Sequence, residues 1–466
     1  ADRRYAGSQA DVMRADQTQI QLRHSLEFGE GLDLTTAVYR HDVERNWYKL
    51  ASVGGVGIEA IANDPAAHPA ELAVVRGADS APDALNVAAN QRTYDARGIQ
   101  SILGVRFGSP GLAHDVELGV RFHQDSEDRF QHADGYAMEA GRMRQTSAGA
   151  PGGNGNRLSE ASAWAFFAQD QLRLGRWTVT PGVRHERIAF TRTDYAANDP
   201  GRTAPTKVRE NDVQVWIPGV GLGLTLNEST SVFTGIHRGF APPGPGADRD
   251  TEAEASINVE AGGRFQRGAW RVQTAVFHNA YSNILGRSTL AGGDPSGSGE
   301  LFNGGAARVR GLELAVDGDP ARALGFGGAI PLHLAYTWTD ARFTSSFTSA
   351  FEPWGTVVSG DALPYVAPHQ LFVSAGLEGG PWTGQLTASR IGAMRTRAGR
   401  GRIAAGEGTD AHTVWGLTAT YAVTPWSALF AGIENLTGER YVVARQPAGA
   451  RPGLPRTLMV GLRLGH

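Results

Sequence analysis

Hydrophobic and polar residues alternate along most of the chain, in segments of roughly ten residues or more separated by polar stretches. In one such segment Val116, Leu118, Val120 and Phe122 alternate with charged or small residues. The final run, 457–466, repeats the pattern with leucine and valine at every second position. A period of two predicts β-strands with one apolar and one polar face, which suits strands between lipid and a wet interior.

Short and long connections alternate between the predicted strands. The short turns are expected at 29–31, 109–111, 174–176, 227–228, 267–268, 379–381 and 424–425. The long loops are expected near 132–159, 195–210, 240–254, 284–300, 346–364, 398–410 and 438–454. A further long segment, 51–93, is predicted to hold a short helix near Glu71–Val75. Barrels of the bacterial outer membrane place short turns in the periplasm and long loops outside, so the alternation predicts an orientation as well as a fold.

The pattern predicts an all-β fold, a transmembrane antiparallel β-barrel with about seventeen strands. The first strand, before Gly29, and the last strand, which ends at His466, both have to run toward the short-turn end. First and last strands that run the same way imply an odd number of strands, whereas closed bacterial barrels have an even number. We therefore expect residues 1–466 to form one barrel domain that is incomplete on its N-terminal side.

One connection does not fit this simple pattern, and one glycine-rich stretch needs a separate interpretation. The connection Asp317–Ile330 is long although it occurs where a short turn is expected, and the sequence offers no reason for it. The glycine-rich stretch Gly152–Asn156 lacks the Lys-Ser/Thr of a phosphate-binding loop. It is predicted to be a flexible loop tip.

Composition narrows the possible functions. The mean hydropathy is −0.28, and the longest apolar runs fall far short of the roughly twenty residues of a membrane helix. The formal net charge of −3 provides no basic face, so nucleic acid is not an expected partner. The absence of cysteine excludes disulfides and thiolate metal sites. Neither a Ser/His/Asp arrangement nor a histidine pair with metal-ligand spacing is recognisable, so we expect no enzyme, no resident metal and no cofactor.

Several segments resemble TonB-dependent outer-membrane receptors, and in particular the receptors for ferric dicitrate and related iron chelates. The segments occur in the same order as in that family and are Arg3–Gln9, Glu44–Leu50, His237–Gly246, Phe302–Gly305, Val309–Glu313, Glu434–Leu436, Glu439–Tyr441 and Pro455–Arg463. Each is a modest signal alone, but together they span nearly the whole chain.

The resemblance implies a barrel of about twenty-two strands that encloses an N-terminal plug, of which residues 1–466 contain neither the plug nor the first strands. It also implies a bacterial outer-membrane receptor that takes up a ferric chelate with energy from the TonB–ExbB–ExbD complex. The expected partners are that complex, reached through the plug, the chelate itself, and lipopolysaccharide or other outer-membrane lipid. A monomer is expected.

An anionic chelate such as ferric dicitrate requires arginine, because the guanidinium fork pairs with a carboxylate at two points. The predicted ligand-binding residues are Arg45, Trp47, Arg238, Arg395, Arg397 and Arg400, with Arg402 next to the last three. The alternative is that these arginines pair with carboxylates of the interior or with lipopolysaccharide phosphates. The alternative for the tryptophans, including Trp47, Trp164, Trp354 and Trp415, is a place in the aromatic girdles or in packed loops.

Three other functions stay open at this point. An unplugged barrel of this size would be a passive channel with an aqueous pore. A membrane protease or lipase would need a catalytic arrangement that the sequence does not reveal. A surface protein that binds ligands or adheres without transport would have the same strand pattern.

Overall fold

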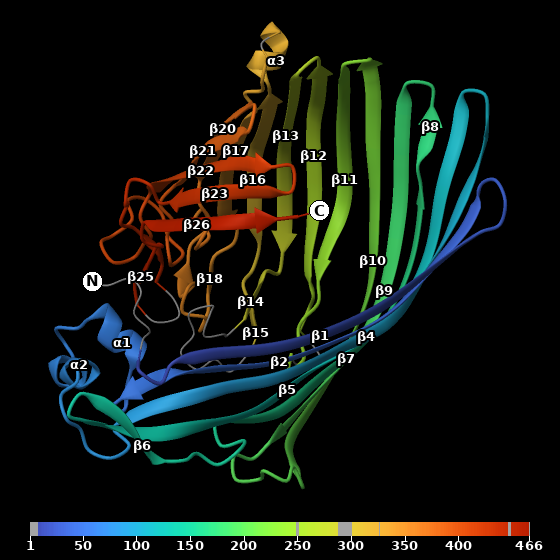
Figure 1. Ribbon diagram of the computed structural model, residues 1–466. Helices are drawn as coiled ribbons and strands as arrows, with labels where there is room; N and C mark the ends of the chain where they lie inside the picture. The colour runs from blue at the N-terminus through green and yellow to red at the C-terminus, as the bar shows by residue number, and fades with distance from the viewer. Residues whose placement is uncertain (1–7, 248–250, 288–300, 326, 446–448, 466) are drawn as a thin grey trace.

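The computed structural model describes residues 8–247, 251–287, 301–325, 327–445 and 449–465. The start of the predicted segment Arg3–Gln9, most of the predicted loop 284–300 and the last residue His466 lie outside the described residues. Within them, strands dominate, and the long ones follow one another in chain order as neighbours in one antiparallel sheet (Figure 1).

Seventeen long strands form the wall of this sheet. They are β1 (Val12–Glu27), β2 (Leu32–Val53), β4 (Leu85–Ser109), β5 (Leu112–Glu139), β7 (Gly155–Asp170), β9 (Trp177–Tyr195), β10 (Pro205–Asn227), β11 (Thr230–Ala241), β12 (Glu254–Arg267), β13 (Trp270–Ser282), β16 (Ala307–Gly318), β17 (Leu332–Phe343), β20 (His369–Gly379), β21 (Trp382–Ile391), β22 (His412–Thr424), β23 (Ser427–Glu434) and β26 (Thr457–Leu464). The count agrees with the sequence pattern.

Shorter elements decorate the ends of the wall. Three short strands join the large sheet and six form separate pairs: β3 (Val56–Gly57), β6 (Arg142–Ser147), β8 (Leu172–Leu174), β14 (Leu285–Arg287) with β15 (Leu301–Asn303), β18 (Phe347–Thr348) with β19 (Thr356–Val357), and β24 (Val442–Ala444) with β25 (Arg451–Pro452). The helices are α1 (Ile58–Asn63), α2 (Pro69–Val75) and α3 (Pro320–Leu324). Helix α2 confirms the predicted short helix. No helix among the described residues is long and apolar enough to cross a membrane.

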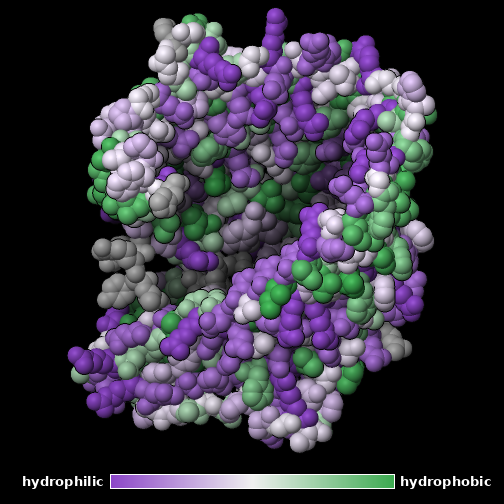
Figure 2. Space-filling view, turned by 45° about the vertical axis from the view of Figure 1, so that its right-hand side comes forward, coloured by the Kyte–Doolittle hydropathy of each residue, from purple (hydrophilic) through white to green (hydrophobic). Residues whose placement is uncertain are grey.

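The sheet is an open wall over the part of the chain that the structure describes. Strand β1 pairs with β2 alone, and β26 pairs with β23 alone. Both edge strands run toward the short-turn end, as the parity of the strand count predicts. Figure 1 places α1, α2 and β6 at the long-loop end and α3 at the opposite end. Figure 2 shows that the curved wall surrounds a deep hollow, with hydrophilic residues along much of its rim.

The predicted short turns are confirmed, and the unexplained connection contains helix α3. Asp319 caps this helix, because its carboxylate accepts hydrogen bonds from the backbone N–H of Arg322 at 3.1 Å and of Ile330 at 3.0 Å. These backbone hydrogen bonds hold the pKa of Asp319 below its usual value. Gly325 ends the helix with a left-handed φ of 75°. A capped helix therefore replaces a two-residue turn at this one place.

The prediction of a long loop at 132–159 is wrong for most of these residues, which belong to strands. Strand β5 continues to Glu139, turns through Ala140 and Gly141 with φ of 47° and 75°, and returns as β6. The flexible tip predicted at Gly152–Asn156 is also wrong in part. The side chain of Asn156 is buried and donates hydrogen bonds to the carbonyls of Ala196 and Asp199. This amide ties two neighbouring connections together.

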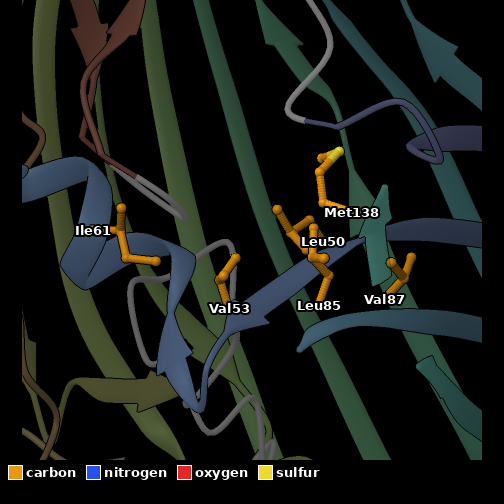
Figure 3. Close-up of a cluster of buried hydrophobic side chains, with 6 residues drawn as sticks. All are labelled: Leu50, Val53, Ile61, Leu85, Val87 and Met138. Carbon is orange, nitrogen blue, oxygen red and sulfur yellow. The ribbon is translucent and has the colours of Figure 1, made fainter. Parts of the chain in front are cut away.

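A small hydrophobic core lies at the long-loop end, where α1 packs on the wall (Figure 3). Ile61 of α1, Leu85 and Val87 of β4, and Met138 of β5 are almost fully buried there. A second core holds Phe343 of β17 with residues of the following loop, among them Trp354. The long loops are thus folded structures that are anchored by their own apolar side chains.

The remaining tryptophans mark two levels on the outward face of the wall. One group follows the short turns and consists of Trp177, Trp270, Trp382 and Trp426; the other lies further along the strands and consists of Trp164, Trp216, Trp338 and Trp415. All eight are at least one-third exposed. Aromatic residues at two levels are typical of the two interfaces of a membrane. The alternative assignment is therefore supported for Trp164 and Trp415, while Trp354 belongs to a packed loop.

Candidate functional site

Strand register determines which side chains face the interior. Val38, Ile99, Phe122 and Trp164 are cross-strand neighbours on β2, β4, β5 and β7, and Ile99 and Trp164 are each nearly half exposed on the outward face. Side chains alternate along a strand, so on each of these strands the residues directly before and after the outward one point inward. In agreement, inward Tyr39 hydrogen-bonds to His123 across the sheet at 2.6 Å. The even-numbered residues of β2 and the odd-numbered residues of β4 therefore face outward.

Four arginines form one row across the inner face, toward the long-loop end. Arg45 pairs in register with Arg92, Arg92 with Arg129, and Arg129 with Arg157. Side chains that are directly opposite on adjacent strands have Cβ atoms about 5 Å apart. Like charges in that position destabilise a sheet, so four of them in succession point to a function.

Two more arginines continue the group on the next strands. Arg192 of β9 pairs in register with Arg209 of β10. Arg192 also pairs with Ser159 of β7, which lies two residues from Arg157 on the same inward face. We call these six residues the inner arginine cluster: Arg45, Arg92, Arg129, Arg157, Arg192 and Arg209. Arg129 and Arg192 are at most 7% exposed, so most of this charge lies beneath the surface of the wall.

Two carboxylates lie within the inner arginine cluster. Glu127 contacts Arg92 at 2.8 Å and Arg129 at 3.0 Å. Asp194 contacts Arg192 at 2.7 Å and approaches Arg209 at 4.0 Å. Six arginines less these two carboxylates leave a formal charge of +4. Partly buried charges are screened less by salt and water than surface charges, so this excess creates a positive field at the inner wall.

Some donors of the inner arginine cluster have no acceptor in the described residues. The Nε atoms of Arg45 and Arg209 are both buried without a hydrogen-bond partner. The guanidinium of Arg45 lies 5.7 Å from the ring centre of Tyr94, which orients it without using its donors. Buried polar groups are costly unless they are paired. An anion with several carboxylates would provide both the missing acceptors and the missing negative charge.

The other predicted residues fall into separate places. Trp47 lies on the same inward face as Arg45, two residues further along β2, with the ammonium of Lys49 at 4.2 Å from its ring centre. The arginines at 395, 397 and 400 lie in the loop between β21 and β22. Arg397 pairs with Glu352, Arg400 contacts Asp361 at 3.1 Å, and Arg395 donates to a backbone carbonyl.

The loop group therefore differs from the inner arginine cluster in charge balance. A cavity of about 320 Å³ next to Arg397 is lined by Arg445 and by three glutamates, Glu59, Glu352 and Glu407. Since carboxylates outnumber arginines there, this cavity suits an anion less well than the inner wall does. The prediction of a chelate contact by Arg395, Arg397 and Arg400 stays untested.

Arg238 points away from the interior. It occupies the same face of β11 as Ile236 and pairs in register with Ile257 of β12, and these isoleucines are 47% and 57% exposed. Its guanidinium reaches the carbonyl oxygen of Trp216 at 3.4 Å. Arg238 was predicted to contact the ligand, but the alternation of side chains along β11 puts it on the outer surface.

Sequence reasoning identified Arg45 but missed the other five members of the inner arginine cluster. One signal was available for two of them. Residues at equal distance from a tight hairpin turn are paired, so the turn at 109–111 pairs Arg92 with Arg129. The prediction began the first of these strands only after residue 93, so Arg92 was assigned to a connecting segment, and it assigned the end of β5 from residue 132 to a loop. Within the described residues, no group of three or more acidic or histidine side chains could hold a metal ion.

The chain belongs to the TonB-dependent receptor-like β-barrel family, whose model matches residues 1–436. The barrels of this family lie in the bacterial outer membrane, and the strand pattern and the girdles of this chain agree with that location. The family consists of receptors and transporters, and iron chelates are prominent among the ligands of its members. This result confirms the resemblance drawn from the sequence segments.

Individual relatives are more distant. The chain is 30% identical over 148 residues to the pesticin receptor of Yersinia enterocolitica and 23% identical over 317 residues to the ferrienterobactin receptor of Escherichia coli. These matches span 30% and 60% of this chain but only 21% and 37% of those relatives.

Solved structures share the fold along nearly the whole chain. The ferric citrate transporter FecA in its unliganded form superimposes with a TM-score of 0.74 at 17% identity, covering 99% of this chain and 63% of that one. The ferric-catecholate import receptor Fiu of Escherichia coli superimposes with a TM-score of 0.73 at 17% identity, covering 99% and 65%. The chain therefore spans less than two thirds of the length of these structures.

Proposed function

We propose that the chain forms part of the wall of an outer-membrane receptor that binds a carboxylate-rich ferric chelate, with ferric dicitrate as the model ligand. In the intact protein, the TonB–ExbB–ExbD complex would supply the energy for uptake. The observation that carries this proposal is the formal charge of +4 on the inner arginine cluster, with two buried Nε donors that lack acceptors. Family membership supports the receptor role.

The chemistry of the site favours an anionic chelate over a neutral one. A chelate that presents several carboxylates can accept bidentate hydrogen bonds from neighbouring guanidinium groups. Arg45 and Arg209, at the two ends of the inner arginine cluster, retain unused donors, so they are the proposed first contacts. Glu127 and Asp194 hold the arginines between them in place and keep their mutual repulsion within limits.

The test is a titration of the purified intact protein with ferric dicitrate, followed by tryptophan fluorescence. The variant pair Arg45→Ala with Arg209→Ala removes two arginines of the inner arginine cluster. The matched control, Arg395→Ala with Arg397→Ala, removes the same charge from the loop group. We expect saturable binding that the inner pair weakens roughly hundredfold, since it loses two hydrogen bonds to charged groups and each is worth at least about 1.5 kcal/mol.

Two results would contradict the proposal. Equal weakening by both pairs would mean that total charge rather than the inner arginine cluster attracts the chelate. No saturable binding, together with ion conductance through a planar bilayer that ferric dicitrate does not block, would favour the passive channel.

A further inference from the structure

A second group of arginines lies on the outward face of the wall, on β16 and β17. Leu312 pairs in register with Trp338, one of the outward tryptophans. Two residues further toward the long loops, Arg310 pairs with Asp340. Because side chains alternate along a strand, these residues share the outward face.

The next outward pair, Arg308 with Arg342, completes this group. We call Arg308, Arg310 and Arg342 the outer arginine cluster. All three surround one carboxylate, since Asp340 accepts from Arg342 at 2.6 Å and from Arg310 at 3.1 Å and lies 3.8 Å from Arg308. Three arginines and one aspartate leave a formal charge of +2.

The outer arginine cluster still has donors to offer. The side chain of Asp340 is only 14% exposed, whereas those of Arg310 and Arg342 are 48% and 42% exposed. The Nε atom of Arg308 is buried and has no hydrogen-bond partner among the described residues. The shared carboxylate lies beneath the guanidinium groups. Arg342 also donates to the carbonyl of Gly360 at 3.0 Å, and the exposed edges of Arg310 and Arg342 are available to a second anion.

The depth of the outer arginine cluster matches a membrane interface. Trp270 marks the short-turn end of the wall next to β16, and Trp338 marks the second aromatic level. Asp340 lies on β17, which begins at Leu332 at the short-turn end. With a strand tilt of about 40°, this places it roughly 20 Å along the membrane normal from that end, and the apolar band is about 25 Å tall. Arg308 and Arg342 lie two residues, or roughly 5 Å, further out, so their guanidinium groups reach the outer boundary of the apolar band, where the lipid headgroups of the outer leaflet begin.

We propose that the outer arginine cluster binds the phosphate of a phosphorylated glycolipid of the outer leaflet. A phosphate monoester carries a charge of about −1.5 to −2 and offers three acceptor oxygens, which complements three guanidinium groups with a net charge of +2. A cavity of about 390 Å³, lined by Arg310, Trp338, Arg342 and the loop residues Leu363 and Pro368, provides space for the headgroup. The acyl chains would lie along Leu312 below it.

Lipid is the source of phosphate that the geometry favours. The outer arginine cluster faces away from the hollow in which a soluble ligand would bind, and an aromatic girdle lies directly below it. This site is independent of the inner arginine cluster, so it does not depend on the proposed chelate.

The experiment measures lipid retained by the purified intact protein in detergent, by native mass spectrometry, after incubation with diphosphorylated lipid A. The variant pair is Arg310→Ala with Arg342→Ala. The control pair, Arg267→Ala with Arg322→Ala, removes the same charge from exposed positions at the short-turn end. Parallel arms use dephosphorylated lipid A and competition by inorganic phosphate. Unheated gel mobility verifies that each variant is a folded barrel.

We expect the variant pair to retain at least roughly tenfold less diphosphorylated lipid than the unchanged protein, and the control pair to retain the same amount. Dephosphorylated lipid should be retained as poorly by the unchanged protein as the phosphorylated lipid is by the variant pair. The proposal is overturned if the variant pair retains as much lipid as the control, or if the phosphate-free lipid is retained equally well. Displacement by inorganic phosphate at lipid-equivalent concentration would also overturn it, in favour of a free anion. If the alanine pair does not fold, Arg310→Gln alone takes its place with the same criteria.

Discussion

The inner and outer arginine clusters share one structural feature, a cross-strand pair of arginines on adjacent strands. On the inner face, Arg92 pairs with Arg129, and on the outer face Arg308 pairs with Arg342. They differ in depth and in balance: the inner cluster is mostly buried and has two carboxylates for six arginines, whereas the outer one is half exposed and has one for three. A shift of one residue along a strand is enough to move an arginine from one environment to the other.

This difference determines how much each cluster should contribute to binding. Charge pairs in the partly buried inner wall are screened less than pairs at the surface, so each contact with an anion there is worth more. The same burial makes the unoccupied inner cluster costly, because neighbouring guanidinium groups repel one another. We expect chelate binding to stabilise the inner wall measurably, while lipid binding outside should change stability little.

The largest effect is expected for charge reversal at the centre of the inner arginine cluster, Arg129→Glu. The change removes a guanidinium and adds a carboxylate next to Glu127, which Arg129 now contacts at 3.0 Å. Affinity for ferric dicitrate should fall roughly hundredfold or more, on the scale of about 1.5–3 kcal/mol per charged hydrogen bond. Fluorescence titration measures it. Lipid A retention should not change, and a parallel loss of both ligands would show that the two clusters are not independent.

A smaller effect is expected for Arg45→Lys at the edge of the same cluster. Lysine keeps the charge but loses the planar fork and the stacking of the guanidinium over Tyr94, 5.7 Å from the ring centre. Affinity should fall by roughly threefold to tenfold, corresponding to about one lost hydrogen bond. Arg192→Lys, where Asp194 already takes the donors at 2.7 Å, is the matched comparison and should lose less. Equal losses at both positions would argue against a ligand contact by Arg45.

The comparison also shows which part of this structure the sequence could predict. The alternation along 115–123, the tight turns and the direction of the edge strands follow from local patterns, and the structure agrees with them. Local patterns also identified Arg45 as a candidate, because it lies with Trp47 at the outward end of a predicted strand. They could not reveal that Arg45 and Arg92 are neighbours, since the connection between β2 and β4 contains α1, α2 and a register shift. Pairing across a long loop depends on tertiary packing rather than on turn geometry.

The face on which an arginine lies was equally hard to predict for Arg238. Its neighbours Gly239 and Phe240 give no clear alternation in the sequence, and the exposed face of Ile236 together with the pairing with Ile257 shows that it points outward. Arg308, Arg310 and Arg342 were not recognised as a group either. In their case α3 and the turn after it lie between β16 and β17, so the register of the two strands could not be read from the sequence. Strand positions were thus predictable, but register across irregular connections was not.

A third, weak effect is expected for the loop arginines. Arg397→Ala breaks the pair with Glu352, but both side chains are about half exposed, at 58% and 43%. Exposed ion pairs contribute roughly 0–1 kcal/mol, so chelate affinity should change less than about fivefold. The same titration measures it, with Arg400→Ala as companion, since Asp361 already neutralises that side chain at 3.1 Å. A loss as large as that for Arg129→Glu would move the binding site from the inner wall to the loops.

The smallest effect is expected at Asp319, which belongs to neither cluster and lies at the opposite end of the wall. Backbone hydrogen bonds from Ile330 and Arg322 lower its pKa in the folded state. A carboxylate with a lowered folded pKa stabilises the turn above its unfolded pKa of about 3.9 and loses this contribution as the pH falls through the folded value. Amide hydrogen exchange at Arg322 and Ile330 should therefore become faster, relative to the intrinsic rates, as the pH falls below about 4. Asp319→Asn should remove most of this pH dependence and leave both chelate affinity and lipid retention unchanged. A change in either ligand would mean that the short-turn end is coupled to the clusters, and the two faces of the wall would then no longer be separate binding surfaces.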